Sequence, residues 1–86
     1  MPLNPQTSKP MITTSYNTDY LKRQTDRYLA STSERLQHDA LYRIGTHADV
    51  LDVADIDEID SNNGFLSDEQ VDRVLDFLRQ QELLTD

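Results

Sequence analysis

Apolar residues at helical spacing near the carboxyl end constrain the fold of this chain more than any other feature. Four of them fall at i, i+3, i+4 and i+7, namely Val71, Val74, Leu75 and Leu78. This spacing places them on one face of an α-helix. Ser67 is typical of the residue that caps such a helix, and Gln70, three positions later, completes a capping box. The pattern predicts a helix that begins after Ser67 and ends near Leu83.

A second stretch with helical periodicity runs from about Asp19 to Ile44. Its apolar residues recur near the 3.6-residue period, namely Leu21, Tyr28, Leu29, Leu36, Ala40, Leu41 and Ile44. Thr18 is a suitable N-terminal cap, and Gly45 suits a left-handed cap at the other end. We therefore predict helical structure over this stretch, with its apolar face turned toward the core.

The weak point of this stretch is the segment Ser31-Thr32-Ser33. Serine and threonine are poor in helix interiors, because their side chains compete with the backbone for hydrogen bonds. Ser31 followed by Glu34 also has the form of a capping box, which would begin a new helix. The sequence favours one continuous helix over residues 19–44, and two helices separated at residues 30–32 are the alternative.

A shorter helix is predicted for residues 47–58, where Thr46 and Asp49 can cap its start. Asn63-Gly64 follows as a turn before the C-terminal helix. A strand in this region would need pairing partners that the rest of the chain does not offer. The fold class that we predict is all-α, with a long N-terminal helix packed on a C-terminal helical hairpin.

The first seventeen residues differ from the rest, because they contain all three prolines, Pro2, Pro5 and Pro10. Proline lacks a backbone N–H and its ring clashes with the preceding helical turn, so it excludes a helix here. We divide the chain into an extended arm, residues 1–17, and a small helical domain, residues 18–86. An arm this polar can bury little surface against its own domain, so we expect a neighbouring subunit or partner to hold it.

Charge is divided unequally between the two halves of the chain. Residues 1–47 hold six basic and four acidic side chains, whereas residues 48–86 hold two basic and twelve acidic ones, for net charges of +2 and −10. Such an acidic half repels phosphate backbones and anionic lipid. No apolar run approaches the ~20 residues needed to cross a bilayer. We expect no direct nucleic-acid binding, no membrane insertion, and a place in the cytoplasm or in a soluble particle such as a virion rather than secretion.

The sequence offers little for catalysis. It has no cysteine, and its two histidines, His38 and His47, supply too few ligands for a zinc site. No nucleophile elbow, glycine-rich phosphate loop or metalloprotease motif occurs. A helical domain this small has little room for a pocket that excludes water. We therefore expect a protein that is not an enzyme, with His38 on the solvated surface of its helix.

Residues 57–70 are the segment with the look of a metal site. Oxygen-bearing side chains precede Gly64, an apolar residue follows it by two positions, and an acidic helix start comes next. In this order the segment resembles an EF-hand calcium loop, although Gln70 stands where the loop has a bidentate glutamate. A one-residue insertion would bring in three candidate ligands, Glu58, Asp60 and Asn62. We expect an ordinary turn between helices and no cofactor, with calcium binding as the alternative.

Aromatic and basic residues are interleaved in the first half of the chain. Five of them are our candidates for binding a partner, namely Tyr16, Tyr20, Arg23, Arg27 and Tyr28. Tyrosine and arginine are enriched at protein interfaces. The alternatives are packing of the tyrosines against the chain's own core and stacking on single-stranded nucleic acid.

Carboxylates of the second half can form an acidic face, whose candidates are Asp52, Asp60, Asp68, Asp72 and Asp76. The last three fall at i, i+4 and i+8 of the predicted C-terminal helix, and so on one side of it. A stripe of this kind can imitate a nucleic-acid backbone toward a basic protein. The simpler interpretation is a solvated surface that keeps a small protein soluble.

Together these features favour a non-enzymatic accessory or structural subunit of a larger protein assembly, which docks through its arm and a Tyr/Arg helix face. A single core in about seventy residues rarely supplies more than ~3–5 kcal/mol, so support from a partner or from a second copy of the chain is reasonable. Two alternatives remain open. One is an acidic inhibitor that mimics nucleic acid and blocks a basic protein surface, and the other is a degenerate EF-hand-like, calcium-responsive module.

Overall fold

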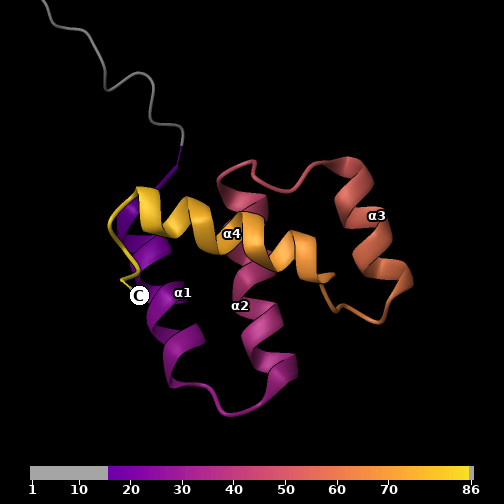
Figure 1. Cartoon of the computed structure of the whole chain (residues 1–86), viewed down its shortest axis with the longest axis horizontal. Coiled ribbons are helices and arrows are strands. Elements are labelled where there is room, and N and C mark those ends of the chain that lie inside the picture. Colours follow the sequence, from indigo (N-terminus) through magenta and orange to yellow (C-terminus); the bar gives the residue numbers. More distant parts are fainter. Residues whose placement is uncertain (1–15, 86) are drawn as a thin grey trace, which may run out of the picture.

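The computed structural model describes residues 16–85, and every regular element in this range is an α-helix. The helices are α1 (Thr18–Ala30), α2 (Glu34–His47), α3 (Val53–Ser61) and α4 (Asp68–Gln80). Figure 1 shows α1 and α2 side by side as a hairpin, with α4 lying across them and α3 set apart from α1. The predicted all-α fold class is confirmed. Most of the predicted arm, residues 1–15, lies outside the described residues.

The prediction of one continuous helix over residues 19–44 is wrong, because α1 and α2 are separate helices. Ser31 ends α1 in an extended conformation (φ −77°, ψ 137°). Ser33, and not Ser31, caps α2, and its Oγ accepts a hydrogen bond from the N–H of Leu36 at 3.4 Å. Gln37 Nε2 donates to the Ser31 carbonyl at 2.9 Å, which holds the turn. The alternative of a break in this serine-rich segment is therefore correct, since its hydroxyl groups cap better than they continue a helix.

Two other helix starts differ from prediction by a few residues. Asn17 rather than Thr18 caps α1, and its Oδ1 accepts from the N–H of the residue three positions later. α3 begins at Val53, with Asp52 as its cap, instead of near His47. The chain between α2 and α3 turns sharply, because the residue at position 49 has a left-handed backbone (φ 60°). That turn shortens α3 relative to the predicted helix.

The prediction for the C-terminal helix is confirmed at its start. Ser67 Oγ accepts from the N–H of Gln70 at 3.2 Å, and Gln70 Oε1 accepts from the N–H of Ser67 at 2.8 Å. The turn before it also forms where predicted, with Asn63 (φ 60°) and Gly64 (φ 88°) in the left-handed region that these residues tolerate best. α4 ends at Gln80, slightly before the predicted end.

Gly45 is not the predicted left-handed cap, since α2 continues through it to His47. Glycine is required here by close packing instead. A Cβ at this position would lie 2.5 Å from Leu51 Cγ and 3.2 Å from Val74 Cγ2. Leu51 is only 2% exposed, and its N–H donates to the Gly45 carbonyl at 3.0 Å. The missing side chain thus lets the chain fold back onto α2 beside α4.

One hydrophobic core holds the described residues together, and α2 is its central helix, packed against both α1 and α4. The buried apolar cluster consists of Leu21, Leu41, Ile44, Leu51, Ile59, Leu66, Val74 and Leu78. Leu29 and Leu36, which the periodicity placed on the apolar face, are 60% and 48% exposed. The break after α1 explains the difference. The apolar face was predicted for one continuous helix, and the break changes the direction in which residues on its two sides point.

Candidate functional site

The tyrosines predicted to bind a partner also make contacts within the chain. Tyr16 lies against α4, where its hydroxyl donates to Gln81 Oε1 at 2.7 Å and its ring meets Phe77 edge-on with centroids 5.5 Å apart. Tyr28 is half-buried against the core. Tyr20 packs on a histidine ring at the end of α2, at a centroid distance of 4.7 Å. The three rings therefore lie in different environments, and their role in partner binding stays a prediction.

Arg23 and Arg27 are exposed one turn apart on α1. Arg27 NH1 donates to Gln24 Oε1 at 2.6 Å, and its NH2 forms an ion pair with Asp39 of α2 at 3.3 Å. Both partners of that ion pair are more than a third exposed, so its contribution to stability is small. Arg27 is thus partly committed to joining the two helices of the hairpin.

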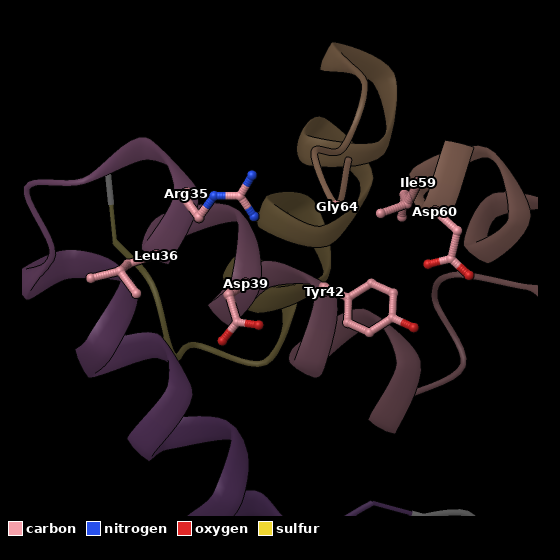
Figure 2. A pocket seen from close by; sticks show the side chains of 7 residues that line it. All are labelled: Arg35, Leu36, Asp39, Tyr42, Ile59, Asp60 and Gly64. Atoms are coloured by element: carbon pink, nitrogen blue, oxygen red, sulfur yellow. The ribbon is translucent and has the colours of Figure 1, made fainter. Parts of the chain in front are cut away.

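A groove lies between α2, α3 and the turn that follows α3 (Figure 2). Its volume is about 370 Å³, and it is lined by Arg35, Leu36, Asp39, Tyr42, Ile59, Asp60 and Gly64. Asp39 and Tyr42 follow the adjacent Arg35 and Leu36 at intervals of three or four, so the lining residues from α2 share one face of that helix. The Tyr42 ring points across the groove toward α3, where Asp60 lies (Figure 2). Leu36 adds an apolar side chain that folding leaves half exposed.

A second hollow, of about 410 Å³, continues along α2 between α2 and α1. It is lined by Tyr20, Asp39, Tyr42, Arg43, Thr46 and His47. Asp39 and Tyr42 line both hollows, so the two hollows are neighbours along one face of α2. We call this combined surface, with all the residues that line either hollow, the α2 groove.

The arginines of the α2 groove are engaged within the chain. Asp39 Oδ2 accepts from Arg43 Nε at 2.9 Å, in addition to its ion pair with Arg27. Partial burial raises the pKa of Asp39, but the hydrogen bonds and charges of Arg43 and Arg27 outweigh it and hold this pKa below its usual value. Arg35 lies over the Phe65 ring, with 5.0 Å between the guanidinium carbon and the ring centroid. Arg27 and Arg43 are therefore paired with one carboxylate, whereas Arg35 lies on a neutral ring and keeps its charge.

The carboxylates predicted to form an acidic face are all exposed, namely Asp52, Asp60, Asp68, Asp72 and Asp76. The last three follow one side of α4, and Asp76 forms a surface ion pair with Arg79 at 2.9 Å. Asp52 caps α3. Asp60 lines the α2 groove and forms no ion pair within residues 16–85. Asp60 is thus a negative charge of the groove that a ligand could compensate.

The segment that resembles a calcium loop uses its oxygen donors in other contacts. Glu58 accepts from Gln70 Nε2 at 3.1 Å, and Asn62 Nδ2 donates to the Phe65 carbonyl at 3.2 Å. Ile59, which lies between them in sequence, is 1% exposed and belongs to the core. Among residues 16–85, no three His, Asp or Glu side chains are grouped so that they could hold a metal ion. The segment is built as a turn between helices, and calcium binding stays a prediction.

A polar cluster that sequence reasoning missed joins α3 to α4. Arg73 donates to both carboxylate oxygens of Asp55, at 2.6 and 3.1 Å. Gln70 is 1% exposed and donates through Nε2 to Asp55 Oδ1 at 3.1 Å and to Glu58 Oε1 at 3.1 Å. Asp55 also accepts from the N–H of Asp52 at 3.0 Å, which closes the capping box of α3. We call Asp55, Gln70 and Arg73 the α3–α4 clasp.

The α3–α4 clasp makes stability depend on pH through Asp55. Hydrogen bonds from Arg73, the N–H of Asp52 and Gln70 hold the pKa of Asp55 well below its usual range. An unfolded aspartate takes up its proton near pH ~3.9, so this stabilisation is complete well above pH ~4 and is lost as the pH falls further. We expect urea unfolding to show Asp55→Asn less stable than wild type at pH 7, with a difference that shrinks steadily as the pH falls below about 4. A constant difference across this pH range would contradict the assignment.

Both histidines are built into contacts within the chain. The prediction of a solvated His38 is wrong, since its side chain is 14% exposed and Nδ1 accepts from the N–H of Leu66 at 2.9 Å. The His38 ring also meets Phe65 edge-on at a centroid distance of 5.2 Å. His47 Nε2 accepts from the N–H of Asn17 at 2.7 Å. The surface assignment failed because the loop between α3 and α4 folds over His38, and helical periodicity does not place that loop.

Sequence reasoning also missed most of the α2 groove. Tyr42 is not among the binding candidates that the sequence indicates, and periodicity places Leu36 on the core face. The available signal is spacing, because Arg35, Asp39, Tyr42 and Thr46 recur at intervals of three or four on one helix face. Within residues 16–85, no helix is long and apolar enough to span a membrane. Comparisons of the chain with protein-family models, with curated proteins and with solved structures find no match.

Proposed function

We propose that this chain is a non-enzymatic accessory subunit that docks on a partner protein through the α2 groove. The observation that carries the proposal is the sharing of Asp39 and Tyr42 between two hollows, which places the two side by side along one helix. A depression of this shape suits an extended or helical segment of a partner. Leu36, which is 48% exposed at one end, offers apolar surface for that segment to cover.

The charges around the groove favour a basic partner segment. Arg43 is paired with Asp39, while Arg35 lies over the Phe65 ring and keeps its charge. Asp60 has no ion-pair partner among residues 16–85, and residues 48–86 carry a net charge of −10. A segment with one apolar side chain over Leu36 and one lysine or arginine near Asp60 would satisfy both features.

The predicted arm, residues 1–17, enters the proposal as a second contact with the same partner. Its last two residues are attached to the domain, because Tyr16 bonds Gln81 and the N–H of Asn17 bonds His47. The arm therefore starts from a fixed point beside α4, which supports a defined direction of docking. Removal of residues 1–15 is expected to weaken docking and to leave the helical content unchanged.

A single charge placed in the groove tests the proposal. We expect Leu36→Asp to reduce capture of the partner at least tenfold in a pull-down from the source cells, since it sets a carboxylate against the apolar contact. Leu29→Asp is the matched control, because Leu29 is also exposed (60%) but does not line the groove. Circular dichroism verifies that both variants fold. Equal capture by both variants would refute docking through the α2 groove.

The exposed acidic stripe on α4 favours a second candidate function, an acidic inhibitor of a nucleic-acid-binding protein. The stripe consists of Asp68, Asp72 and Asp76, all on the surface. In the same pull-down, this function predicts a basic partner that is lost on replacing all three by asparagine and retained by Leu36→Asp. Its affinity would also fall steeply with salt, because screened charges would supply most of the attraction.

A further inference from the structure

We propose that His38 and His47 are two proton-sensitive latches at opposite ends of α2. When neutral, His38 holds the loop between α3 and α4, and His47 holds the start of α1. Protonation of the imidazoles releases both segments. This inference rests on hydrogen-bond geometry and does not depend on the proposed docking function.

The first latch joins α2 to the loop that leads into α4. His38 Nδ1 accepts from the N–H of Leu66 at 2.9 Å, and Leu66 is a core residue with 4% exposure. An imidazole nitrogen that accepts an N–H must carry a lone pair, so the ring proton resides on Nε2. Nε2 lies 3.8 Å from Glu34 Oε2, which is an acceptor on the same side. The neutral Nε2–H form of His38 therefore fits both of its neighbours.

The second latch joins the end of α2 to the start of α1. His47 Nε2 accepts from the N–H of Asn17 at 2.7 Å, and Asn17 is the residue that caps α1. The His47 ring also packs on Tyr20, one turn into that helix. The same reasoning assigns the proton of neutral His47 to Nδ1. His38 thus accepts through Nδ1 from the residue just before the cap of α4. His47 accepts through Nε2 from the cap of α1.

Protonation is incompatible with both contacts. An imidazolium ion carries N–H on both nitrogens and has no acceptor, so at each latch a donor would face a donor. Histidine is the side chain that ordinarily changes charge between pH 5 and 8. Loss of the accepting lone pair therefore removes the hydrogen bond that closes each latch.

The charged neighbours of the two rings do not reverse this effect. Glu34 favours a charged His38, but it is 77% exposed and its attraction is screened. Arg35, over the ring that also meets His38, opposes the charge. In the hollow beside His47, Asp39 is paired with Arg43. The other contacts of the two rings are uncharged. Tyr20 of α1 packs on His47, and Phe65 and Leu66 of the α3–α4 loop contact His38.

Two isosteric variants separate the latches from other titrating groups. In His38→Asn the amide oxygen takes the place of Nδ1, and in His47→Gln it takes the place of Nε2, so each can accept the same N–H without titrating. The measurement is amide hydrogen exchange and amide proton shift by NMR from pH 7.5 to 5.0, corrected for intrinsic exchange. In wild type we expect the protection of the Leu66 and Asn17 amides to fall about 3- to 10-fold, the worth of one hydrogen bond.

Each variant serves as the control for the other. His38→Asn should remove the pH response of Leu66 and leave that of Asn17, and His47→Gln should do the reverse. A pH response that persists at both amides in both variants would overturn the proposal. The response would then belong to carboxylates. Ring-nitrogen shifts of the wild-type protein give an independent test, because at pH 7.5 the acceptors must be Nδ1 of His38 and Nε2 of His47. The opposite tautomers would also overturn it.

Discussion

Replacement of Ile44 by alanine is expected to lower the free energy of unfolding by about 2–5 kcal/mol. Ile44 is fully buried in α2, the helix that packs against both α1 and α4. Truncation removes apolar contacts and leaves a cavity in a core that serves every described helix. A domain of this size has only ~3–5 kcal/mol from such a core, so Ile44→Ala should be largely unfolded at 25 °C.

Urea unfolding followed by circular dichroism measures this loss. Val53→Ala is the matched control, because Val53 is also a β-branched helical residue but is 75% exposed. Its effect should stay within about 0.5 kcal/mol. Similar losses for the two variants would mean that Ile44 is not enclosed as described.

Gln70→Glu is expected to cost about 3 kcal/mol at pH 7, although the two side chains have nearly the same shape. The buried Nε2 of Gln70 donates to Asp55 and to Glu58. A carboxylate oxygen in its place would face two other carboxylates with no proton to share. The loss should shrink under acidic conditions, because a proton taken up by the three clustered carboxylates removes part of their repulsion.

Gln80→Glu controls for the added charge, because Gln80 lies on the same helix and is exposed. Equal losses in the two variants would show that the α3–α4 clasp contributes nothing specific. Gln70→Glu also supplies the glutamate that an EF-hand loop has at this place. A calcium-dependent rise in the melting temperature of this variant, absent in wild type, would mean that the segment lacks only that ligand.

The sequence predicts the parts of the fold that depend on local signals. The capping box of Ser67 and Gln70 sets the start of α4, and Asn63-Gly64 sets the turn before it. Local signals are ambiguous at Ser31-Thr32-Ser33, where periodicity continues across a segment whose hydroxyl groups favour a cap. Tertiary packing decides for the break, because two shorter helices can pack against each other and share one core.

The candidate site is harder to predict because it depends on how helices meet. The α2 groove exists only where α3 and α1 approach the two sides of α2. The α3–α4 clasp likewise pairs Asp55 with Arg73 across eighteen positions of sequence. Gly45 is a further example. Its position after the periodic residues suggests a helix cap, but in the structure its missing side chain leaves space for Leu51. Spacing along one helix assigns residues to a face, but it does not say what that face will meet.

The internal pairing of Arg73 and Arg79 has a consequence for how the molecule behaves in an electric field. Both side chains belong to the half that carries twelve acids, and each is held close to an aspartate. These ion pairs leave the net charge of that half at −10, so the protein is an electric dipole with its negative pole at α3 and α4. A dipole rotates toward a charged body before contact, so collisions with a basic partner would be pre-oriented and their rate, more than the lifetime of the complex, would respond to ionic strength.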